Sequence, residues 1–205
     1  MNSSKVNIII IIFLCQVLTY SCIVMINENG YRDLSRKDFE IVENYNSQID
    51  LKSIDNINDL KIYEINSIQI KNILKTHSYT WIHLWRPYCS NKNCQLIDYY
   101  SHIEEKYLDW NVAFLLISES YDLFSIEKSL NSNPYSGVIY VLSDSYYGHK
   151  LPEIRNKFIS DLTNNENIAI NISYLDFVFK DTSFIYASES MQIELLDSLL
   201  ASSHF

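Results

Sequence analysis

The chain has 205 residues and an acidic composition, with 25 acidic against 16 basic side chains and a formal net charge of −9 at pH 7. This length suffices for one domain with a full hydrophobic core and an N-terminal extension. Nucleic acids and anionic membrane surfaces attract clusters of Lys and Arg, so the charge argues against both as electrostatic partners. With only three glycines, the sequence also argues against a glycine-rich phosphate-binding loop.

The first 21 residues have the pattern of an export signal. Lys5 is the one basic side chain before an apolar run over residues 8–14. Asn7 and Gln16 flank this run and leave it too short for a comfortable membrane span. We therefore expect residues 1–21 to act as a signal peptide, whose removal lowers the net charge by one to −10 because it contains Lys5 and no acid.

The signal ends at a possible site of lipid modification. Ser21-Cys22 resembles the end of a bacterial lipobox, in which the cysteine is acylated and becomes the new N-terminus. Thr19 and Tyr20 depart from the leucine and small residue that are more usual there. We expect Cys22 to anchor the chain in a bacterial cell envelope, facing the periplasm or the cell exterior. An ordinary cleaved signal and an uncleaved anchor, with Cys22 incidental, are the alternatives.

The segment after the signal is polar and irregular. Residues 22–59 combine scattered apolar positions with Asn, Asp and Ser, and they are predicted to form a tether and a loosely packed extension. The acidic stretch over 55–59 marks the expected boundary, so residues 60–205 are assigned to the folded domain.

From residue 60 the sequence alternates between strand and helix patterns. β-branched and aromatic content predicts strands over 61–65, 79–85, 112–117, 138–142, 174–179 and 183–187. Apolar residues at helical spacing predict helices over 66–75, 91–110, 121–130, 151–162 and 188–201. This order predicts an α/β fold with a mixed sheet flanked by helices. The expected core includes Trp85, Leu96, Tyr100, Ile103, Phe114, Leu116, Val141, Phe158 and Leu196.

Cys89 and Cys94 are the residues with the clearest chemical meaning. They lie where the strand over 79–85 runs into a turn and then a helix. The amide groups and partial charge of a helix N-terminus stabilise a thiolate, which attacks disulfides and peroxides. A second sulfur five residues later can release the first from its bonded partner. The placement predicts redox chemistry, with Cys89 attacking and Cys94 resolving. The alternative is a local structural disulfide, which in so short a loop would stabilise the fold only modestly.

The sequence around Cys89 resembles a known family. Leu84-Trp85-Arg86-Pro87-Tyr88-Cys89 is similar to the aromatic-Trp-Ala-x-Trp-Cys motif of the thioredoxin-like family. Trp85 falls on the tryptophan of that motif, Tyr88 on the aromatic before the nucleophile, and Cys89 on the nucleophile itself.

The resemblance covers about residues 60–201 and is closest to exported, membrane-tethered thioredoxins with an extra helix–strand unit in mid-domain, here about 121–142. Residues 179–183 fall on the turn between the last two strands of that fold. The resemblance implies thiol–disulfide exchange without a cofactor, and protein thiols or disulfides of the cell envelope as partners.

Three departures from the family bear on this function. Four residues separate Cys89 from Cys94, where the family has two. The proline that faces the redox sulfur in the family should fall near Ser173, but no proline follows Pro152. The buried acid six residues before the nucleophile is replaced by His83, an imidazole able to move a proton. His83 is therefore either a catalytic residue or a histidine that hydrogen-bonds in the core.

Two further functions stay open. One class of peroxiredoxins also separates its cysteines by four residues, but the threonine of their Pro-x-x-x-Thr-x-x-Cys motif is replaced here by Arg86. The domain could also be a non-catalytic envelope-binding module with a structural disulfide. No metal is predicted, since metal-ligand spacing is missing among His77, His83, His102, His149 and His204.

Overall fold

The structure is a computed structural model that describes residues 28–47, 60–89, 97–133, 135, 137–169, 173–190 and 193–202. The predicted signal peptide, Cys22 and Cys94 lie outside these residues. Among the helices described, none has the length and apolar character needed to cross a membrane.

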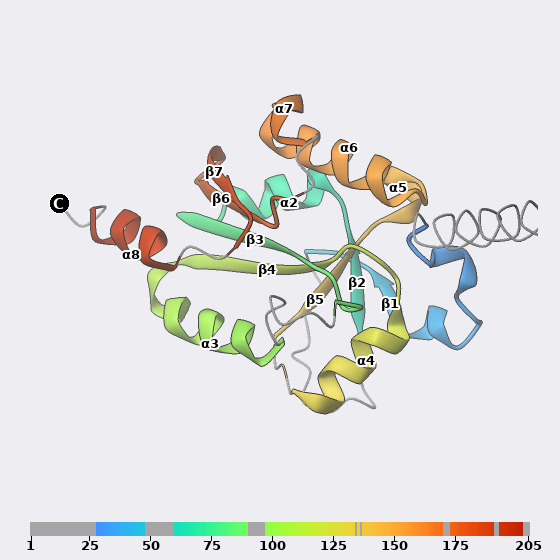
Figure 1. Cartoon of the computed structure of the whole chain (residues 1–205). Helices are drawn as coiled ribbons and strands as arrows, with labels where there is room; N and C mark the ends of the chain where they lie inside the picture. The colour runs from blue at the N-terminus through green and yellow to red at the C-terminus, as the bar shows by residue number, and fades with distance from the viewer. Residues whose placement is uncertain are drawn as a thin grey trace, which may run out of the picture.

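The centre of the molecule is a seven-stranded mixed sheet in the order β1-β2-β5-β4-β3-β6-β7 (Figure 1). Its strands are β1 Val42–Asn44, β2 Ile62–Ile65, β3 Tyr79–Trp85, β4 Val112–Ser118, β5 Ile139–Leu142, β6 Asp176–Lys180 and β7 Ser183–Ser188. The first five strands in this order, β1, β2, β5, β4 and β3, run parallel to one another. β6 is antiparallel to β3, and β7 is antiparallel to β6. β3 is therefore a central strand, with β4 on one side and β6 on the other.

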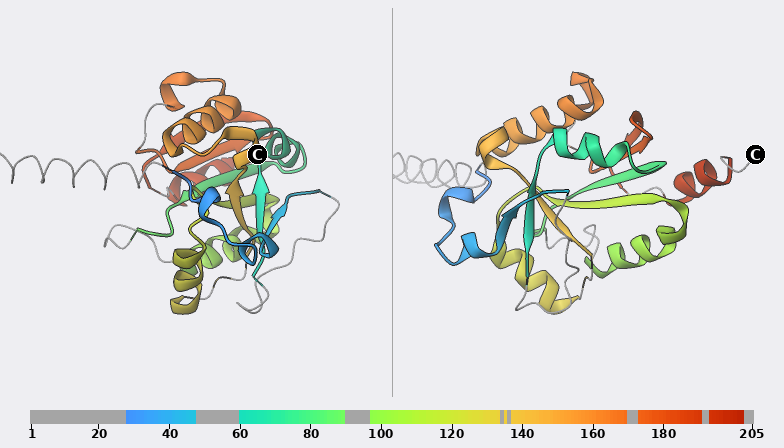
Figure 2. Two further views of the ribbon diagram at one scale, coloured as in Figure 1. Left: turned by 90° about the vertical axis from the view of Figure 1, so that its right-hand side faces the viewer. Right: turned by 180° about the vertical axis from the view of Figure 1, so that it is seen from behind.

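Helices cover both faces of the sheet, as Figures 1 and 2 show. The α-helices are α2 Ser67–Leu74, α3 Ile97–Tyr107, α4 Leu123–Ser132, α5 Asp144–Tyr147, α6 Leu151–Thr163, α7 Glu166–Ala169 and α8 Ile193–Ser202. Short 3-10 helices are η1 Tyr31–Asp33, η2 Asp38–Glu40 and η4 Leu108–Trp110. Residues of α2 and α6 pack on one face, and residues of α3, α4 and α8 pack on the other.

The local sequence explains where several helices begin. The side chain of Asn66 accepts hydrogen bonds from the amides of Ile68 and Gln69, and Gln69 accepts one from the Asn66 amide, which completes a capping box at α2. Asp122 accepts a hydrogen bond from the Ser125 amide at 3.0 Å and so caps α4. Such caps satisfy amide groups that have no partner within the helix.

The predicted fold class is confirmed. Strands and helices alternate through β3, α3 and β4 and on to α6, and the hairpin β6–β7 and the helix α8 close the chain, which gives the predicted mixed sheet flanked by helices. The predicted mid-domain unit is α4 with β5, and β5 lies between β2 and β4. The turn over 179–183 joins β6 to β7, and Asp181 there adopts a positive φ of 49°.

The expected core is largely confirmed. The buried members are Trp85, Tyr100, Ile103, Leu116, Val141, Phe158 and Leu196. Phe114 is partly buried and packs against two of the three core clusters, while Leu96 lies outside the described residues.

Part of the N-terminal extension joins the sheet. Val42 of β1 pairs with Ile62 of β2, and the amides of Ile62 and Tyr45 donate hydrogen bonds across this pair at 3.0 and 2.9 Å. The strand patterns did not predict β1, because a three-residue edge strand is too short to show alternation. Residues 41–45 of the extension are thereby held along the edge of the sheet that begins with β1.

Candidate functional site

Cys89 lies just beyond the carboxyl end of the central strand. Every residue of β3 is buried, whereas Tyr88 and Cys89 are exposed. A turn over residues 86–89 follows β3, and it is closed by the Cys89 amide, which donates to the Arg86 carbonyl at 3.0 Å. Cys89 is disulfide-bonded. The predicted helix N-terminus and Cys94 fall in the segment 90–96, outside the described residues, so the thiolate argument based on that helix stays a prediction.

A buried ionic network lies beside this turn. Arg86 Nε donates to Glu119 Oε2 at 2.6 Å, and Arg155 donates to the other carboxylate oxygen. Arg155 also donates to the Tyr174 carbonyl, and the Glu119 amide donates to the Trp85 carbonyl at 3.0 Å. The network therefore joins the carboxyl ends of β3 and β4, helix α6 and the segment that leads into β6.

The charges of this network are unequal in number. Two guanidinium groups face the single carboxylate of Glu119, so this network taken by itself carries one excess positive charge. The Asp122 carboxylate also acts on Tyr88, the residue before Cys89. Burial lowers the pKa of Arg155, although Glu119 opposes this change. Burial also acts to lower the pKa of Arg86, but the hydrogen bond to Glu119 and the charges of Glu119 and Tyr88 together outweigh that effect and raise the pKa. Positive charge close to a cysteine favours the reactive thiolate.

His83 belongs to a second buried network. Its Nδ1 lies 2.8 Å from Asp176 Oδ1, and its Nε2 lies 2.8 Å from the Tyr100 hydroxyl. Trp81 Nε1 donates to the same Asp176 oxygen at 2.8 Å. Because an ionised carboxylate only accepts, Nδ1 of the imidazole carries a hydrogen in this arrangement. Burial, and then the charge of Asp176, raise the pKa of Tyr100 well above its usual value, so its hydroxyl keeps its proton.

The register of the sheet explains how this network forms. His83 and Asp176 are directly paired across β3 and β6. The neighbouring strand thus brings a carboxylate directly to the His83 imidazole. Both ring nitrogens of His83 are engaged, as expected of a core histidine, and its role in catalysis stays a prediction.

The structure describes two of the four predicted site residues. Cys89 and His83 both belong to β3 or its exit, while Cys94 and Cys22 lie outside the described residues. Next to the predicted proline position, Arg155 donates to the carbonyl of Tyr174, and among the described residues no peptide bond is cis.

Three buried charged residues of these networks were missed by sequence reasoning. Arg155 lies beside Ile154 on the apolar stripe of α6, and a charge in that position signals a buried partner. Glu119 directly follows the apolar strand β4, where side chains at the carboxyl ends of parallel strands converge. Asp176 is an acid that directly precedes the three apolar residues of β6. Each of these signals was present in the sequence.

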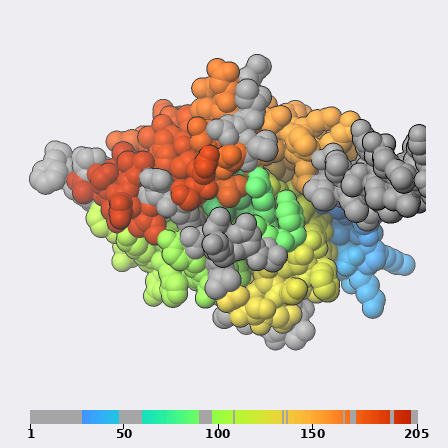
Figure 3. Space-filling model, in the orientation of Figure 1, coloured from blue at the N-terminus to red at the C-terminus, as the bar shows by residue number. Residues whose placement is uncertain are grey.

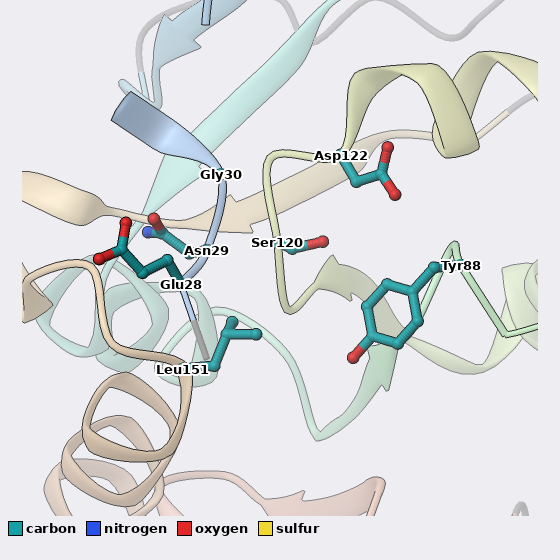
Figure 4. Close-up of a pocket in the computed structure, with 7 residues that line it drawn as sticks. All are labelled: Glu28, Asn29, Gly30, Tyr88, Ser120, Asp122 and Leu151. Carbon is teal, nitrogen blue, oxygen red and sulfur yellow. The ribbon is translucent and has the colours of Figure 1, made fainter. Parts of the chain in front are cut away.

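A pocket of about 300 Å³ opens beside Tyr88 (Figure 4). It is lined by residues 28–30, by Tyr88, by Ser120 and Asp122 after β4, and by Leu151 at the start of α6. Burial, and then the charge of Glu119, raise the pKa of Tyr88, so its hydroxyl stays protonated. The pocket lies at the carboxyl ends of β3 and β4, where ligands commonly bind in open α/β sheets.

The fold and this site define an α/β protein with an exposed half-cystine at the carboxyl end of its central strand. No protein-family model matches the chain, and no curated protein matches it. Among solved structures, it is similar to the solution structure of a thioredoxin-like protein in its oxidized form, with 16% sequence identity and a TM-score of 0.43 over 68% of this chain and 86% of that one.

Proposed function

We propose that this protein carries out thiol–disulfide exchange through Cys89 and Cys94, as an exported, lipid-anchored member of the cell envelope. The observation that carries the proposal is the state and position of Cys89. It is disulfide-bonded and exposed at the exit of the central strand, beside a network with excess positive charge. We assign Cys94, five residues later, as its partner.

The proposed exchange needs no other oxidant or reductant, because the substrate disulfide and the Cys89–Cys94 pair exchange all of the electrons between them. In the reducing direction, the Cys89 thiolate attacks one sulfur of a substrate disulfide, forms a mixed disulfide and releases one substrate thiolate. The Cys94 thiolate then attacks the Cys89 sulfur, which releases the second substrate thiol and forms the Cys89–Cys94 disulfide. Two electrons pass from the cysteine pair to the substrate, and the reverse sequence oxidises a substrate dithiol.

A trapping experiment tests the proposal. Cys94→Ser removes the resolving sulfur, so reaction of this variant with glutathione disulfide should stop at a stable mixed disulfide on Cys89, detected by mass. Its alkylation by iodoacetamide should reach half of the plateau rate below about pH 8, because a nearby positive charge favours the thiolate. Cys89→Ser is the matched control and should form the mixed disulfide far more slowly.

A different outcome would favour the non-catalytic alternative. If the Cys94→Ser variant forms no mixed disulfide and titrates like an ordinary cysteine, the exchange proposal fails. The protein is then better explained as a thioredoxin-like binding module of the envelope with a structural disulfide.

Lipid anchoring is tested separately. We expect the native protein to begin at Cys22 and to carry the mass of acyl chains, since stable anchoring needs more than one chain. Intact mass after detergent extraction measures this directly. An unmodified N-terminus at any other residue would remove the anchor from the proposal and leave the exchange chemistry unaffected.

A further inference from the structure

An acidic groove leads away from the Cys89 turn. The pocket beside Tyr88 shares Glu28, Gly30 and Asp122 with a second pocket of about 520 Å³. The second pocket continues to Phe124 at the start of α4. Figure 3 shows the chain over 28–47 (blue) bordering α4 (yellow), and the second pocket is lined by residues of both. The two pockets therefore form one path from the Cys89 turn to the mid-domain helix.

The N-terminal wall of the groove is firmly held. The Asn29 amide donates to the His149 carbonyl at 2.8 Å, and the Tyr121 amide donates to the Asn29 carbonyl at 2.7 Å. The Asn29 side chain donates to Asp144 Oδ1 at 3.0 Å. Residues 28–30 are thereby fixed between the start of α4 and the region of α5 and α6, so the groove is a built feature of the fold.

The lining of the groove carries charge of one sign. Its acidic side chains belong to Glu28, Asp33, Asp38, Asp122 and Glu127. Neither pocket includes a Lys or Arg among its described lining residues. The carboxylates come from two separate stretches of chain, and no three acidic, His or Cys side chains among the described residues are grouped as ligands for a metal ion. Positive charges spaced along an extended polypeptide match this distribution.

A buried hydroxyl without a partner points into the groove. Ser120 is only 5% exposed, and among the described residues its Oγ has no hydrogen-bond partner. The backbone of Ser120 is already satisfied, because Ser118 Oγ bonds both its amide and its carbonyl. Figure 4 shows the Ser120 hydroxyl directed toward the side on which Tyr88 lies. A buried polar atom of this kind needs a partner, and a bound ligand can supply one.

Exposed aromatic rings lie toward the two ends of the groove. Tyr88 is 46% exposed and Phe124 is 75% exposed, so both present apolar area beside the carboxylates. An aromatic ring attracts a Lys or Arg cation placed over its face and also packs against the aliphatic stem of that side chain. The combination of rings and carboxylates therefore suits basic side chains better than acidic ones.

We propose that this groove binds an extended, Lys- or Arg-containing segment of the substrate polypeptide and presents the neighbouring substrate sulfur to Cys89. The inference rests on the proposed thiol–disulfide exchange and names its substrate class. Tyr88 and Cys89 are consecutive residues, and the Cα atoms of consecutive residues are about 3.8 Å apart. A substrate chain bound against Tyr88 therefore passes close to Cys89. Ser120 bonds the bound segment, while Glu28 and Asp122 pair with its basic side chains.

A binding experiment tests the groove independently of redox chemistry. A fluorescent peptide with several lysines, and with serine in place of its cysteine, is titrated with the full mature protein. A peptide of the same length with glutamate in place of each lysine is the comparison. We expect the lysine peptide to bind at least about tenfold more tightly, with the preference shrinking as salt screens exposed charges.

Variants locate the binding site. The double change Glu28→Gln and Asp122→Asn should weaken lysine-peptide binding by about tenfold, and Ser120→Ala should weaken it several-fold through loss of one hydrogen bond. The matched control, Asp109→Asn with Glu189→Gln, removes two charges outside the groove lining and should leave binding unchanged.

The outcomes separate this inference from the proposed function. Equal binding of the two peptides, or equal losses in the groove variants and the control, would overturn the groove and leave the exchange proposal standing. The lysine peptide could bind selectively although the Cys94→Ser variant traps no mixed disulfide. This result would uphold the groove as a binding site and refute the exchange. Selective binding, with faster mixed-disulfide formation by a cysteine-containing lysine peptide than by its glutamate counterpart, supports both.

Discussion

Asp176→Ala is expected to lower the free energy of unfolding by about 2–6 kcal/mol, the cost of leaving two buried hydrogen-bond donors without their acceptor. The Asp176 side chain is fully buried, and one of its oxygens accepts from both Trp81 and His83. Its removal leaves two buried donors without an acceptor, and each such group costs about 1–3 kcal/mol. The loss also frees the imidazole that binds the Tyr100 hydroxyl.

The conservative variant and a surface control make this prediction specific. Asp176→Asn keeps one acceptor oxygen and should cost about 1–2 kcal/mol, because the charge is lost and the geometry is kept. Asp109→Ala, on the exposed surface of η4, should stay within about 0.5 kcal/mol of the parent. Urea unfolding followed by tryptophan fluorescence measures all three. Equal losses for Asp176→Ala and Asp109→Ala would show that the buried network does not stabilise the fold.

Arg155→Met is expected to destabilise the protein by about 2–4 kcal/mol, because it breaks a buried ion pair while Arg86 continues to compensate the acid. Arg155 is 5% exposed and binds both Glu119 and the Tyr174 carbonyl. Methionine fills a similar volume without donating a hydrogen bond, so the Tyr174 carbonyl loses its donor. Since that carbonyl precedes β6, the change should also loosen the segment beside the Cys89 turn.

Two comparisons identify the cause of this effect. Arg155→Lys keeps the charge but lacks the planar fork that reaches two acceptors, so it should recover only part of the stability. Arg36→Met removes an exposed guanidinium and should change the free energy of unfolding by less than about 0.5 kcal/mol. Urea midpoints compare the variants, and amide hydrogen exchange over 173–175 reports on the segment. Full recovery by lysine would exclude bidentate binding as the stabilising feature.

The sequence was informative where the pattern is local. The strand over 79–85 is observed with the predicted bounds, because most of its residues are aromatic or β-branched and such residues favour strands. α6 was also predicted well, since its apolar stripe and the proline in its first turn both indicate a helix. The closing helix begins at Ile193, after the predicted start at 188, because β7 continues through Ser188.

The two buried networks depend on register and could not be predicted from local pattern. Asp176 meets His83 only because β6 runs antiparallel to β3 in one particular alignment, and a shift by one residue would turn the acid to the other face. Arg155 reaches Glu119 across the packing of α6 on the sheet. Periodicity identifies the elements that carry these residues but does not set their alignment.

The acidic groove was beyond sequence reasoning for a similar reason. Its walls come from residues 28–30, from Tyr88, from the start of α4 and from Leu151, which are distant in the chain. The extension over 22–59 was interpreted as a tether with a loosely packed segment, and its polar composition gave no sign that Asn29 would be buried. Only the folded arrangement brings the carboxylates and the Cys89 turn to one surface.

The reduction potential of the Cys89 disulfide distinguishes a disulfide that exchanges with substrates from one that only stabilises the fold. The native protein is equilibrated in glutathione or dithiothreitol buffers of graded potential, then alkylated and weighed to give the fraction reduced. We expect a value between about −270 and −120 mV, the range of proteins that exchange disulfides. A value below about −300 mV is typical of structural disulfides and would contradict the claim that Cys89 is the reactive sulfur of an exchange site.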